Sequence, residues 1–482
     1  MSYGVVYKKD KKHSVFDRKI VDKLNKIVPD GVSEKEVDKI TYSKDYMPIT
    51  LRWLIDGKIA ALPDCIVWPE STKQISDILK LACKEKTPII PYGDGSGVVG
   101  GAVPIKGGIV VDLKKMDKVV NIDDLGLTIT AQTGINGMNL ERHLNRYGYT
   151  MGHIPQSLYC SSLGGWIACK AAGQFSTKYG KIEDMLVALE AVLPDGTVIK
   201  SKPVPRSSTG PAVERLFLGS EGNLGIVTQA TLKIWPYPEE RAMCSYAFDD
   251  LSKALEAVRK IMRRNVYPAV VRIYDRNETL RHFYKHPETK GKIMLVLLME
   301  GDKKLVKLEE EISEAVCKKE GGISCGDAPV EHWIKSRFNV RETSDFTPRG
   351  FIFDTVEMSV GWKNALDLYS RVIPAMRKIR GIAVASAHAS HFYPQGVCFY
   401  FTFGGVPPKN VDPFEFYQSI WDAMMKACLE ENGSISHHHG IGLMRAKWLE
   451  KEMGERMKLF RAIKETLDPH NIMNPGKMGV EK

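Results

Sequence analysis

The chain has 482 residues, 43% of them hydrophobic and 26% charged, with a formal net charge of +10. This length can bury the cores of two domains and leave an N-terminal extension. No apolar run approaches the ~20 residues of a membrane-spanning helix, no export signal is recognisable, and the basic residues lack the aromatic interleaving of a nucleic-acid-binding surface. The cysteines show no C-x-x-C pair or zinc spacing. We therefore expect a cytoplasmic protein that binds no nucleic acid. Its charge suits an anionic membrane surface or a phosphorylated substrate, and the plainest interpretation is an ordinary solvated surface.

Residues 1–58 mix helical patterns with polar turns and predict a small N-terminal helical region. Residues 59–237 predict the first domain, in which strand-like runs alternate with helices. Its first helix spans residues 71–85, where Ser71 and Gln74 have the spacing of a capping box. The predicted strands of this domain are 87–92, 109–113, 127–132, 186–192 and 230–234.

After Pro236-Tyr237-Pro238, strands and helices alternate again and predict a second domain over residues 238–431. Leu251, Leu255, Val258 and Met262 are predicted to form the buried stripe of its first helix, so we expect helices to cover one face of a sheet. Residues 432–482 are expected to return to the first domain. The predicted strands are 242–248, 269–274, 292–299 and 397–403, and the predicted helices are 251–264, 305–320 and 413–431.

Glycines follow the first predicted strand directly. Residues 93–97 alternate glycine with other small or polar residues, so that successive backbone N–H groups can form a nest for a pyrophosphate. Gly95, Gly97 and Gly100 match the G-x-G-x-x-G of a nicotinamide-binding fold, but another strand follows where that fold requires a helix, and we reject that interpretation. A tight hairpin without a ligand remains the alternative for this loop.

Two further glycine-rich segments lie downstream. Residues 152–184 combine small residues with the paired Gly164 and Gly165, and residues 219–228 contain four more glycines or serines around an acidic residue. Glycine allows backbone to approach a ligand closely and supplies turns with positive φ. Three such loops favour a bulky cofactor, and we expect a flavin.

Five of the twelve histidines fall into two groups, His388 with His391, and His437–His439. Clustered imidazoles near a cofactor are candidates for proton transfer or metal binding. For His388 and His391, an accidental pair of core or surface histidines remains the alternative. Three consecutive histidines between a predicted helix and the Gly440-Ile441-Gly442 turn favour a functional role more strongly.

The three glycine segments together resemble the flavin domain of the vanillyl-alcohol-oxidase (p-cresol methylhydroxylase) family. The family order of P-x-G-x-G-[ST], P-x-S…GG and S-E-G-x-L-G is matched by residues 91–96, 155–165 and 220–225. The resemblance covers residues 63–476 and implies an α+β fold, in which an FAD-binding domain of two subdomains carries an α/β cap domain with an antiparallel sheet. Because the phosphate loop holds no histidine, we expect FAD to be bound non-covalently. The resemblance implies the FAD-binding residues Pro91, Gly93, Gly95, Ser96, Gly97, Pro155, Ser157, Ser161, Gly164, Gly165, Ala172, Gly173, Ile182, Glu221, Gly222, Gly225, Ile226, Val227 and Asn474.

Within this family, residues 433–442 resemble alkylglycerone-phosphate synthase (alkyl-dihydroxyacetone-phosphate synthase), which carries S-H-H-H-G there. The glycolate and D-lactate dehydrogenase subgroup carries S-G-E-H-G, so His438 replaces its glutamate. Tyr400 matches the active-site tyrosine of the synthase, and the step of 37 residues to His437 is kept without a gap. Residues 387–394 stand where the dehydrogenases have their metal motif H-x-G-D-G-N-x-H, and we expect no metal.

The synthase exchanges the acyl group of acyl-dihydroxyacetone phosphate for a fatty alcohol, with FAD and without net redox. The resemblance implies that a base removes a proton beside the ketone and that the flavin N5 holds the carbon covalently. That base is one of His437–His439, of which we favour His438, with its neighbours binding phosphate. Tyr400 would handle the proton of the leaving carboxylate or the incoming alcohol. Arginine pairs with anionic oxygens as a planar fork that keeps its charge. The implied substrate-binding residues are Arg272, Arg341 or Arg337, His388 and His391.

Two departures keep other functions open. Residues 166–173 have fewer hydroxyls than the synthase and Lys170 in place of an arginine, so FAD contacts there would rely on backbone. The ending 471–477 follows the hydroxyacid dehydrogenases. The second hypothesis is therefore an FAD-dependent 2-hydroxyacid dehydrogenase with a metal at His388, His391 and His438, and the third is an electron-relay flavoprotein subunit. The expected partners are a small lipid-phosphate or 2-hydroxyacid substrate and a second copy in a homodimer.

Overall fold

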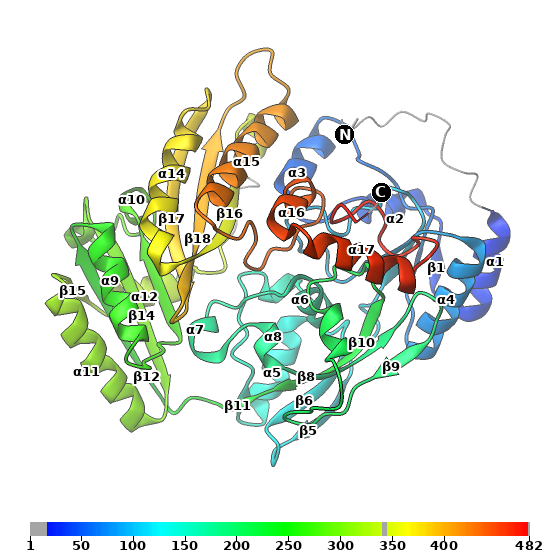
Figure 1. Cartoon of the computed structure of the whole chain (residues 1–482), viewed down its shortest axis with the longest axis horizontal. Helices are drawn as coiled ribbons and strands as arrows, with labels where there is room; N and C mark the ends of the chain where they lie inside the picture. The colour runs from blue at the N-terminus through cyan, green and yellow to red at the C-terminus, as the bar shows by residue number, and fades with distance from the viewer. Residues whose placement is uncertain (1–16, 340–344, 481–482) are drawn as a thin grey trace.

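The structure, a computed structural model, describes residues 17–339 and 345–480. Two parts built of helices and sheets lie side by side, and the C-terminal helices pack on the first of them (Figure 1). Mixed helix and antiparallel sheet confirm the α+β expectation. None of the helices in the described ranges combines the length and hydropathy that crossing a membrane requires.

Helices of the N-terminal region contact both domains. α1 (Arg18–Ile27) packs its apolar face on the first domain. α3 (Pro48–Ile55) packs on the second domain through Trp53, whose ring centroid lies 5.3 Å from that of Phe414. α2 (Glu36–Thr41) lies between them in the chain.

Four strands form the sheet of the first subdomain, in the order β1 (Val32–Ser33), β2 (Cys65–Val67), β4 (Ile109–Asp112) and β3 (Ile89–Tyr92). β2, β4 and β3 are parallel and almost entirely buried, as continuous apolar runs require. α4 (Thr72–Glu85) follows β2, and the Ser71 hydroxyl accepts from the Gln74 N–H at 3.3 Å. The Gln74 side chain accepts from the Glu70 N–H at 2.7 Å, not from Ser71, so only half of the predicted capping box forms.

The second subdomain has five antiparallel strands, in the order β5 (Val119–Asp123), β6 (Thr128–Gln132), β10 (Ile226–Lys233), β8 (Leu186–Val192) and β9 (Val198–Lys200). Alternate residues of β6 are buried, which is the period of a strand with one face on a core. A small pair, β7 (Tyr149–Thr150) with β11 (Trp235–Pro236), joins this subdomain to the next domain. Its helices are α5 (Gly137–Arg146), α6 (Leu163–Cys169), α7 (Ser176–Tyr179) and α8 (Ile182–Met185).

The second domain is built on a seven-stranded antiparallel sheet, in the order β15 (Ile323–Gly326), β12 (Glu240–Phe248), β14 (Ile293–Gly301), β13 (Val270–Tyr274), β17 (Ile382–Phe392), β18 (Gly396–Gly405) and β16 (Ile352–Gly361). Alternate residues of β14 enter opposite cores, Leu295 and Leu297 on one side and Val296 and Leu298 on the other. β16 and β17 were not predicted from the sequence.

Helices cover one face of this sheet, as expected, and the first domain covers the other (Figure 1). One further helix, α12 (Ala328–Ser336), packs on the face toward the first domain through Trp333. That inner face is where the two domains meet. The outer helices are α9 (Leu251–Met262), α11 (Lys303–Lys319), α14 (Ala365–Arg377) and α15 (Pro413–Glu430).

The C-terminal segment lies on the first domain (Figure 1). The backbone of Ile89 in β3 exchanges hydrogen bonds of 2.7 Å with Ile472 and Asn474. α16 (Ala446–Met453) and α17 (Arg456–Leu467) precede this contact. The remaining helical turns are α10 (Arg276–His282), η1 (Leu158–Cys160), η2 (Val213–Phe217), η3 (Pro287–Thr289), η4 (Thr347–Arg349) and η5 (Trp362–Asn364).

Candidate active site

Four neighbouring strands of the second domain place one polar side chain each in a row. In the antiparallel register, Tyr274 of β13 lies opposite His388 of β17, His388 opposite Tyr400 of β18, and Tyr400 opposite Glu357 of β16. Residues paired in this way project from the same face of a sheet. The rings of His388 and Tyr400 are stacked, with centroids 4.7 Å apart and planes at 13°. Tyr274 belongs to the core shared with the first domain, so the row faces that domain.

A β-bulge brings His391 to the same place. The register of β17 against β18 shifts between Ser390 and Phe392, and His391 at the bulge has a φ of +56°. This left-handed conformation costs a non-glycine residue about 1–2 kcal/mol. His391 Nε2 lies 3.3 Å from the Tyr400 hydroxyl, and Nδ1 lies 2.6 Å from Ser176 Oγ of α7. Such strain concentrates at functional sites, and here it turns an imidazole toward Tyr400.

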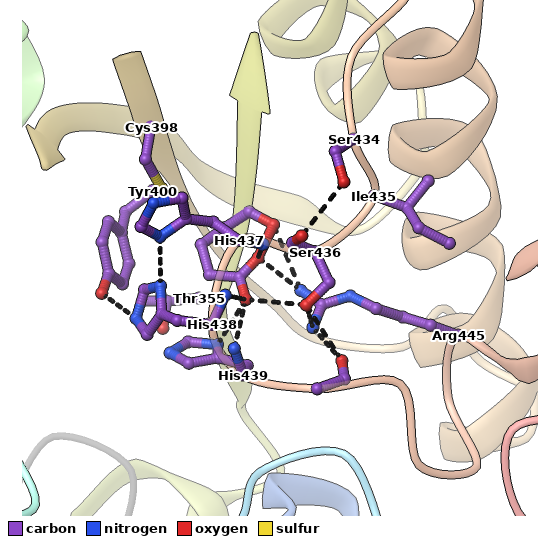
Figure 2. Close-up of polar contacts among 12 residues, drawn as sticks. Thr355, Cys398, Tyr400, Ser434, Ile435, Ser436, His437, His438, His439 and Arg445 are labelled. Atoms are coloured by element: carbon purple, nitrogen blue, oxygen red, sulfur yellow. Dashed lines mark hydrogen bonds and ion pairs between the residues drawn. The ribbon is translucent and has the colours of Figure 1, made fainter. Parts of the chain in front are cut away.

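The three consecutive histidines lie on a loop that one buried carboxylate holds. Glu357 accepts from the backbone N–H groups of His437–His439 at 3.2, 3.1 and 2.6 Å. The guanidinium group of Arg445 points toward Ser436 (Figure 2). It donates to Glu357 Oε2 at 2.9 Å and to the Gly440 carbonyl at 2.7 Å. Burial alone would raise the pKa of Glu357, but the Arg445 charge and the histidine amides outweigh it and lower the pKa. The loop is therefore built on an ionised carboxylate.

A second buried carboxylate holds the other end of this loop. Glu221, from the third glycine segment, accepts from the N–H groups of Ile441 and Gly442 at 2.5 and 2.8 Å. Asn474 of the C-terminal segment donates its side-chain amide to the carbonyls of Glu221 and Gly101, at 2.7 and 2.9 Å. The glycine loops, the histidine loop and the C-terminal segment thus form one hydrogen-bonded unit.

Hydrogen bonds connect the histidine rings with two tyrosines. His438 Nε2 lies 2.5 Å from the Tyr400 hydroxyl, and His438 Nδ1 lies 2.9 Å from His437 Nδ1. Figure 2 draws both contacts as dashed lines. His437 Nε2 lies 2.7 Å from the Tyr393 hydroxyl. His439 Nδ1 is buried without a hydrogen-bond partner among the described residues. The structure brings all four predicted catalytic residues together.

Burial decides the charge of these imidazoles. It lowers the pKa of His437 to about 3 and that of His439 to about 4, and it holds the pKa of His438 and of His391 well below the usual range. Lys181, which donates to the His437 carbonyl at 2.6 Å, acts on His437 in the same direction. The rings are therefore neutral, and a neutral imidazole can accept a proton from a substrate.

Two arginines flank one indole ring near the row. The Arg272 guanidinium lies 5.6 Å and that of Arg337 5.7 Å from the ring centroid of Trp333. Within the described residues, Arg272 donates to the Tyr274 hydroxyl and Arg337 to a backbone carbonyl, and neither is paired with a carboxylate. Such guanidinium groups suit phosphate or carboxylate oxygens. Arg341, the alternative to Arg337, lies outside the described residues.

Glu278 fixes the ring of His388. Its carboxylate, on the buried side of α10, lies 2.9 Å from His388 Nδ1 and also accepts from the Thr402 hydroxyl at 2.6 Å and from Arg281 at 3.0 Å. Burial, with the charge of Arg272, lowers the pKa of His388 to about 4. His388 is thus fixed by Glu278, and its ring stacks on the ring of Tyr400 and holds that ring in place.

Two glycines of the first glycine segment have no free space for a side chain. A Cβ at Gly95, where φ is +69°, would lie 2.1 Å from the Tyr92 hydroxyl, and one at Gly93 would lie 2.2 Å from Ser162 Oγ. Both ring nitrogens of His153 and Asn474 Oδ1, on the neighbouring segments, are buried and unpartnered among the described residues. Tight glycine loops beside orphaned polar atoms fit a bound group that supplies the missing hydrogen bonds. These residues therefore fit a dinucleotide cofactor.

The other predicted cofactor residues lie on the same three segments. A Cβ at Gly222 would lie 2.8 Å from the ring of Pro91, so the first and third segments touch. In the second segment, the Ser161 hydroxyl donates to the Ser157 carbonyl at 2.7 Å and holds the turn between them. Along the chain, the first segment holds Ser96 and Gly97, the second holds Pro155, Gly164, Gly165, Ala172, Gly173 and Ile182, and the third holds Gly225, Ile226 and Val227.

The histidines that could hold a metal ion differ from the expected set. His391, His437 and His438 each offer a ring nitrogen within 4.8 Å of the others. The expected set was His388, His391 and His438. His388 is not part of the observed group, and its Nδ1 is hydrogen-bonded to Glu278. Three neutral imidazoles are a common ligand set for zinc.

Several residues of this site were missed in the sequence. Glu357 is an acidic residue within an apolar run. Had this run been recognised as the strand β16, the acidic residue would have indicated a buried carboxylate that needs a partner. Ser176 and His391 are 215 positions apart, and no local pattern predicts their contact. Arg445 and Tyr393 were likewise missed.

The chain belongs to the FAD-linked oxidase family. Models described as FAD binding domain and as FAD linked oxidases, C-terminal domain, match residues 63–202 and 237–478. The protein is therefore an enzyme that uses FAD, bound by its first domain. The expected family, fold and cofactor are confirmed.

Three relatives and two solved structures place the chain within this family. Alkyldihydroxyacetonephosphate synthase of Dictyostelium discoideum is 30% identical over 94% of this chain and 79% of its own. The uncharacterized FAD-linked oxidoreductase YgcU of Escherichia coli (strain K12) is 32% identical over 95% of this chain and 97% of its own. The glycolate oxidase subunit GlcD of Bacillus subtilis (strain 168) is 27% identical over 93% of this chain and 94% of its own. A structure of alkyldihydroxyacetonephosphate synthase superposes with a TM-score of 0.81 at 27% identity, covering 97% of this chain and 86% of that one. p-Cresol methylhydroxylase has the same fold, with a TM-score of 0.76 at 17% identity over 96% and 97%.

Proposed function

We propose that this enzyme exchanges the acyl group of acyl-dihydroxyacetone phosphate for a fatty alcohol, with FAD bound non-covalently. The observation that carries the proposal is the 2.5 Å contact between His438 and Tyr400. It pairs a neutral imidazole with a phenol at the position where the dehydrogenase pattern has a glutamate. The relatives named alkyldihydroxyacetonephosphate synthase support the same reaction.

His438 and Tyr400 would share the proton work of the exchange. His438 takes the proton from the carbon beside the substrate ketone, because its imidazole is neutral. Tyr400 donates its proton to the departing carboxylate and recovers one from the incoming alcohol, and His388 keeps its ring in place by stacking. Bound FAD would supply an electron-poor ring beside the same carbon.

Arg272 and Arg337 would bind the phosphate of the substrate. Both stack on Trp333, and neither has a carboxylate partner among the described residues. A dianionic group between them would satisfy two fixed charges that cannot be lost by deprotonation. The distance from Arg272 to Tyr400 would then be set by the strands β13, β17 and β18, and the position of Arg337 by the end of α12.

The test is release of fatty acid from acyl-dihydroxyacetone phosphate, with a fatty alcohol present and no electron acceptor. His438→Ala should lower turnover by about 10²–10⁴-fold, the usual contribution of a general base, while the absorbance of bound FAD stays unchanged. His143→Ala, on α5 and away from the site, is the matched control and should keep full activity. Loss of FAD from His438→Ala, or unchanged turnover, would contradict the assignment.

A second candidate is an FAD-dependent 2-hydroxyacid dehydrogenase. The approach of His391, His437 and His438 within 4.8 Å favours it, since a metal there could bind a hydroxyacid. Anaerobic addition of D-lactate or a longer 2-hydroxyacid would bleach the flavin if this candidate is right. No bleaching and no fatty acid release would instead favour the electron-relay subunit.

The proposal extends to a homodimer in the cytoplasm that meets its lipid substrate at a membrane surface. The net charge of +10 supports attraction to anionic headgroups. Co-sedimentation with anionic but not neutral vesicles at low salt, and a dimer mass by light scattering, are the expected results. Equal binding to both kinds of vesicle would remove the electrostatic argument.

A further inference from the structure

We propose that Asp45, in the N-terminal region, binds FAD: its side chain, as the neutral acid, donates a hydrogen bond to an oxygen of the cofactor diphosphate. The inference rests on the prediction that the first glycine segment, residues 93–97, holds that diphosphate. It adds a fourth part to the cofactor site, residues 42–47, which we call the N-terminal strap.

The N-terminal strap contacts the first glycine segment directly. The N–H of Tyr46 donates to the Gly97 carbonyl at 2.8 Å. The Tyr92 hydroxyl, which donates to the Lys44 carbonyl at 3.1 Å, is the group that lies 2.1 Å from the Cβ position of Gly95. The strap therefore helps to fix the path of this segment.

A second contact runs through the neighbouring strand. Lys114 donates to the Gly93 carbonyl at 3.2 Å and pairs with Asp112 at 2.6 Å. Asp112, the last residue of β4, also accepts from the Tyr42 hydroxyl. Ligands of parallel sheets bind outside the carboxyl ends of the strands, and β3 and β4 are parallel. The strap thus lies at the edge of the sheet where a ligand is expected.

Within the strap, Asp45 has a carboxyl oxygen without a partner. The residue is 2% exposed. Its Oδ1 accepts from the Met47 N–H at 3.0 Å, whereas no described residue forms a hydrogen bond with Oδ2. Oδ2 lies 3.4 Å from the Cβ position of Gly97, so it faces the glycine segment where a side chain is missing. Buried polar atoms normally have partners, and a group bound to this segment can provide one.

The surroundings of Asp45 favour its neutral form. Burial raises its pKa to about 6 and outweighs four groups that lower it, which are the amides of Met47, Gly100 and Ala102 and the charge of Lys477. Tyr92 and Cys169, on neighbouring elements, stay neutral, because burial, with carboxylates that include Asp45, raises the pKa of both. The negative charge of a diphosphate raises the pKa of Asp45 further. The acid is then protonated in the complex, and its O–H can donate.

The experiment removes FAD from the full-length protein and titrates it back, with flavin fluorescence as the signal. At about pH 6, half of Asp45 is protonated before FAD binds. Asp45→Asn keeps a neutral donor and acceptor, so its Kd should stay within about threefold of the wild-type value. Asp45→Ala removes the donor, and its Kd should rise by about 10–100-fold, as expected for a hydrogen bond to a charged group.

The matched control is Asp354→Asn. It makes the same exchange at an acid of the second domain whose pKa burial also raises, to about 7. Its Kd for FAD should equal that of the wild type. Urea denaturation of the FAD-free proteins shows whether Asp45→Ala folds, and if it does not, Asp45→Asn decides through its pH dependence.

That pH dependence has a defined sign. Above its pKa of about 6, Asp45 must take up a proton when FAD binds. The wild-type affinity relative to Asp45→Asn should therefore fall by up to about tenfold per pH unit as the pH rises, until the asparagine variant binds FAD more tightly. Calorimetry at about pH 7.5, in two buffers with different enthalpies of ionisation, should show more proton uptake by the wild type than by Asp45→Asn.

Three results would overturn the assignment: equal Kd values for the wild type and a folded Asp45→Ala, equal proton uptake by the wild type and Asp45→Asn, or a change in Asp354→Asn as large as in Asp45→Ala. No substrate is used, so the outcome is independent of the proposed function. Gly95→Ala reports separately on the glycine segment. FAD lost by Gly95→Ala but retained by Asp45→Ala would exclude Asp45 alone, and FAD retained by both would place the diphosphate elsewhere.

Discussion

Gly95 allows a test, at a single residue, of where the cofactor binds. Its φ is +69°, and an added Cβ would lie 2.1 Å from the Tyr92 hydroxyl. Gly57 has almost the same φ, +70°, but no atom lies within 4 Å of its Cβ position. Gly95→Ala and Gly57→Ala therefore share the backbone strain of about 1–2 kcal/mol and differ in the clash. We expect only Gly95→Ala to lose FAD, as measured by flavin absorbance after gel filtration. FAD retained equally by both would show that the loop is not where the cofactor binds.

His153 predicts a specific dependence of stability on pH. It is fully buried with no hydrogen-bond partner among the described residues, and its ring packs at a tilt of 58° against Trp166, with centroids 4.6 Å apart. Burial, with the charge of Lys181, lowers its pKa to about 3, whereas the unfolded chain has ~6.5. The stability this neutral ring contributes is complete above pH ~6.5 and is lost as the pH falls toward the folded pKa, because only the unfolded state binds the proton.

His153→Phe keeps an aromatic ring against Trp166 and removes the group that binds the proton. In FAD-free protein, the free energy of unfolding of the wild type relative to the variant should fall by about 1.4 kcal/mol per pH unit through this window, measured by urea denaturation. Burial raises the pKa of Asp354 to about 7 and that of Asp45 to about 6. These two groups make both proteins more stable as the pH falls, so only the difference in free energy of unfolding between wild type and variant reports on His153. A difference that does not change with pH would contradict a neutral buried His153.

At the scale of elements, the histidine loop depends on a strand far away in the chain. Glu357→Gln removes the carboxylate that faces Arg445, whose side chain is fully buried. Breaking a buried pair costs about 3–5 kcal/mol, so a clear fall in the melting temperature and loss of turnover are expected. Glu431→Gln is the matched control, since its partner Arg371 is half exposed, and the cost there should stay within about 1 kcal/mol. Equal effects of the two changes would mean that the loop does not rest on Glu357.

Local patterns in the sequence singled out the glycine segments and the histidine groups that the structure brings together, because glycines before and after strands and three adjacent imidazoles are visible within a few residues. They did not predict β16 and β17. Polar residues such as Asp354, Glu357 and Ser386 interrupt the apolar alternation there, because those side chains are buried against partners from other elements. The bulge at His391 depends on the register with β18, which no single strand encodes.

At the scale of the whole molecule, FAD should stiffen the histidine loop. Glu221 lies in a segment predicted to bind the cofactor and accepts two N–H groups from residues 441 and 442. Cofactor binding that orders this segment should therefore slow hydrogen exchange over residues 437–442, as measured by mass spectrometry of FAD-free and FAD-bound protein. α11, on the outer face of the second domain, is the internal control and should exchange equally in both. Uniform protection of both regions would indicate global stabilisation instead of this link.

The side-chain amide of Asn474 also has a consequence for biosynthesis. Its bonds to Glu221 and Gly101 join the last part of the polypeptide to turns made hundreds of residues earlier. Domains usually fold in the order in which the ribosome delivers them. Here these two hydrogen bonds can form only after residue 474 has emerged, so the nascent chain passes through a stage in which the turns at Glu221 and Gly101 are made but not yet joined to the C-terminal segment.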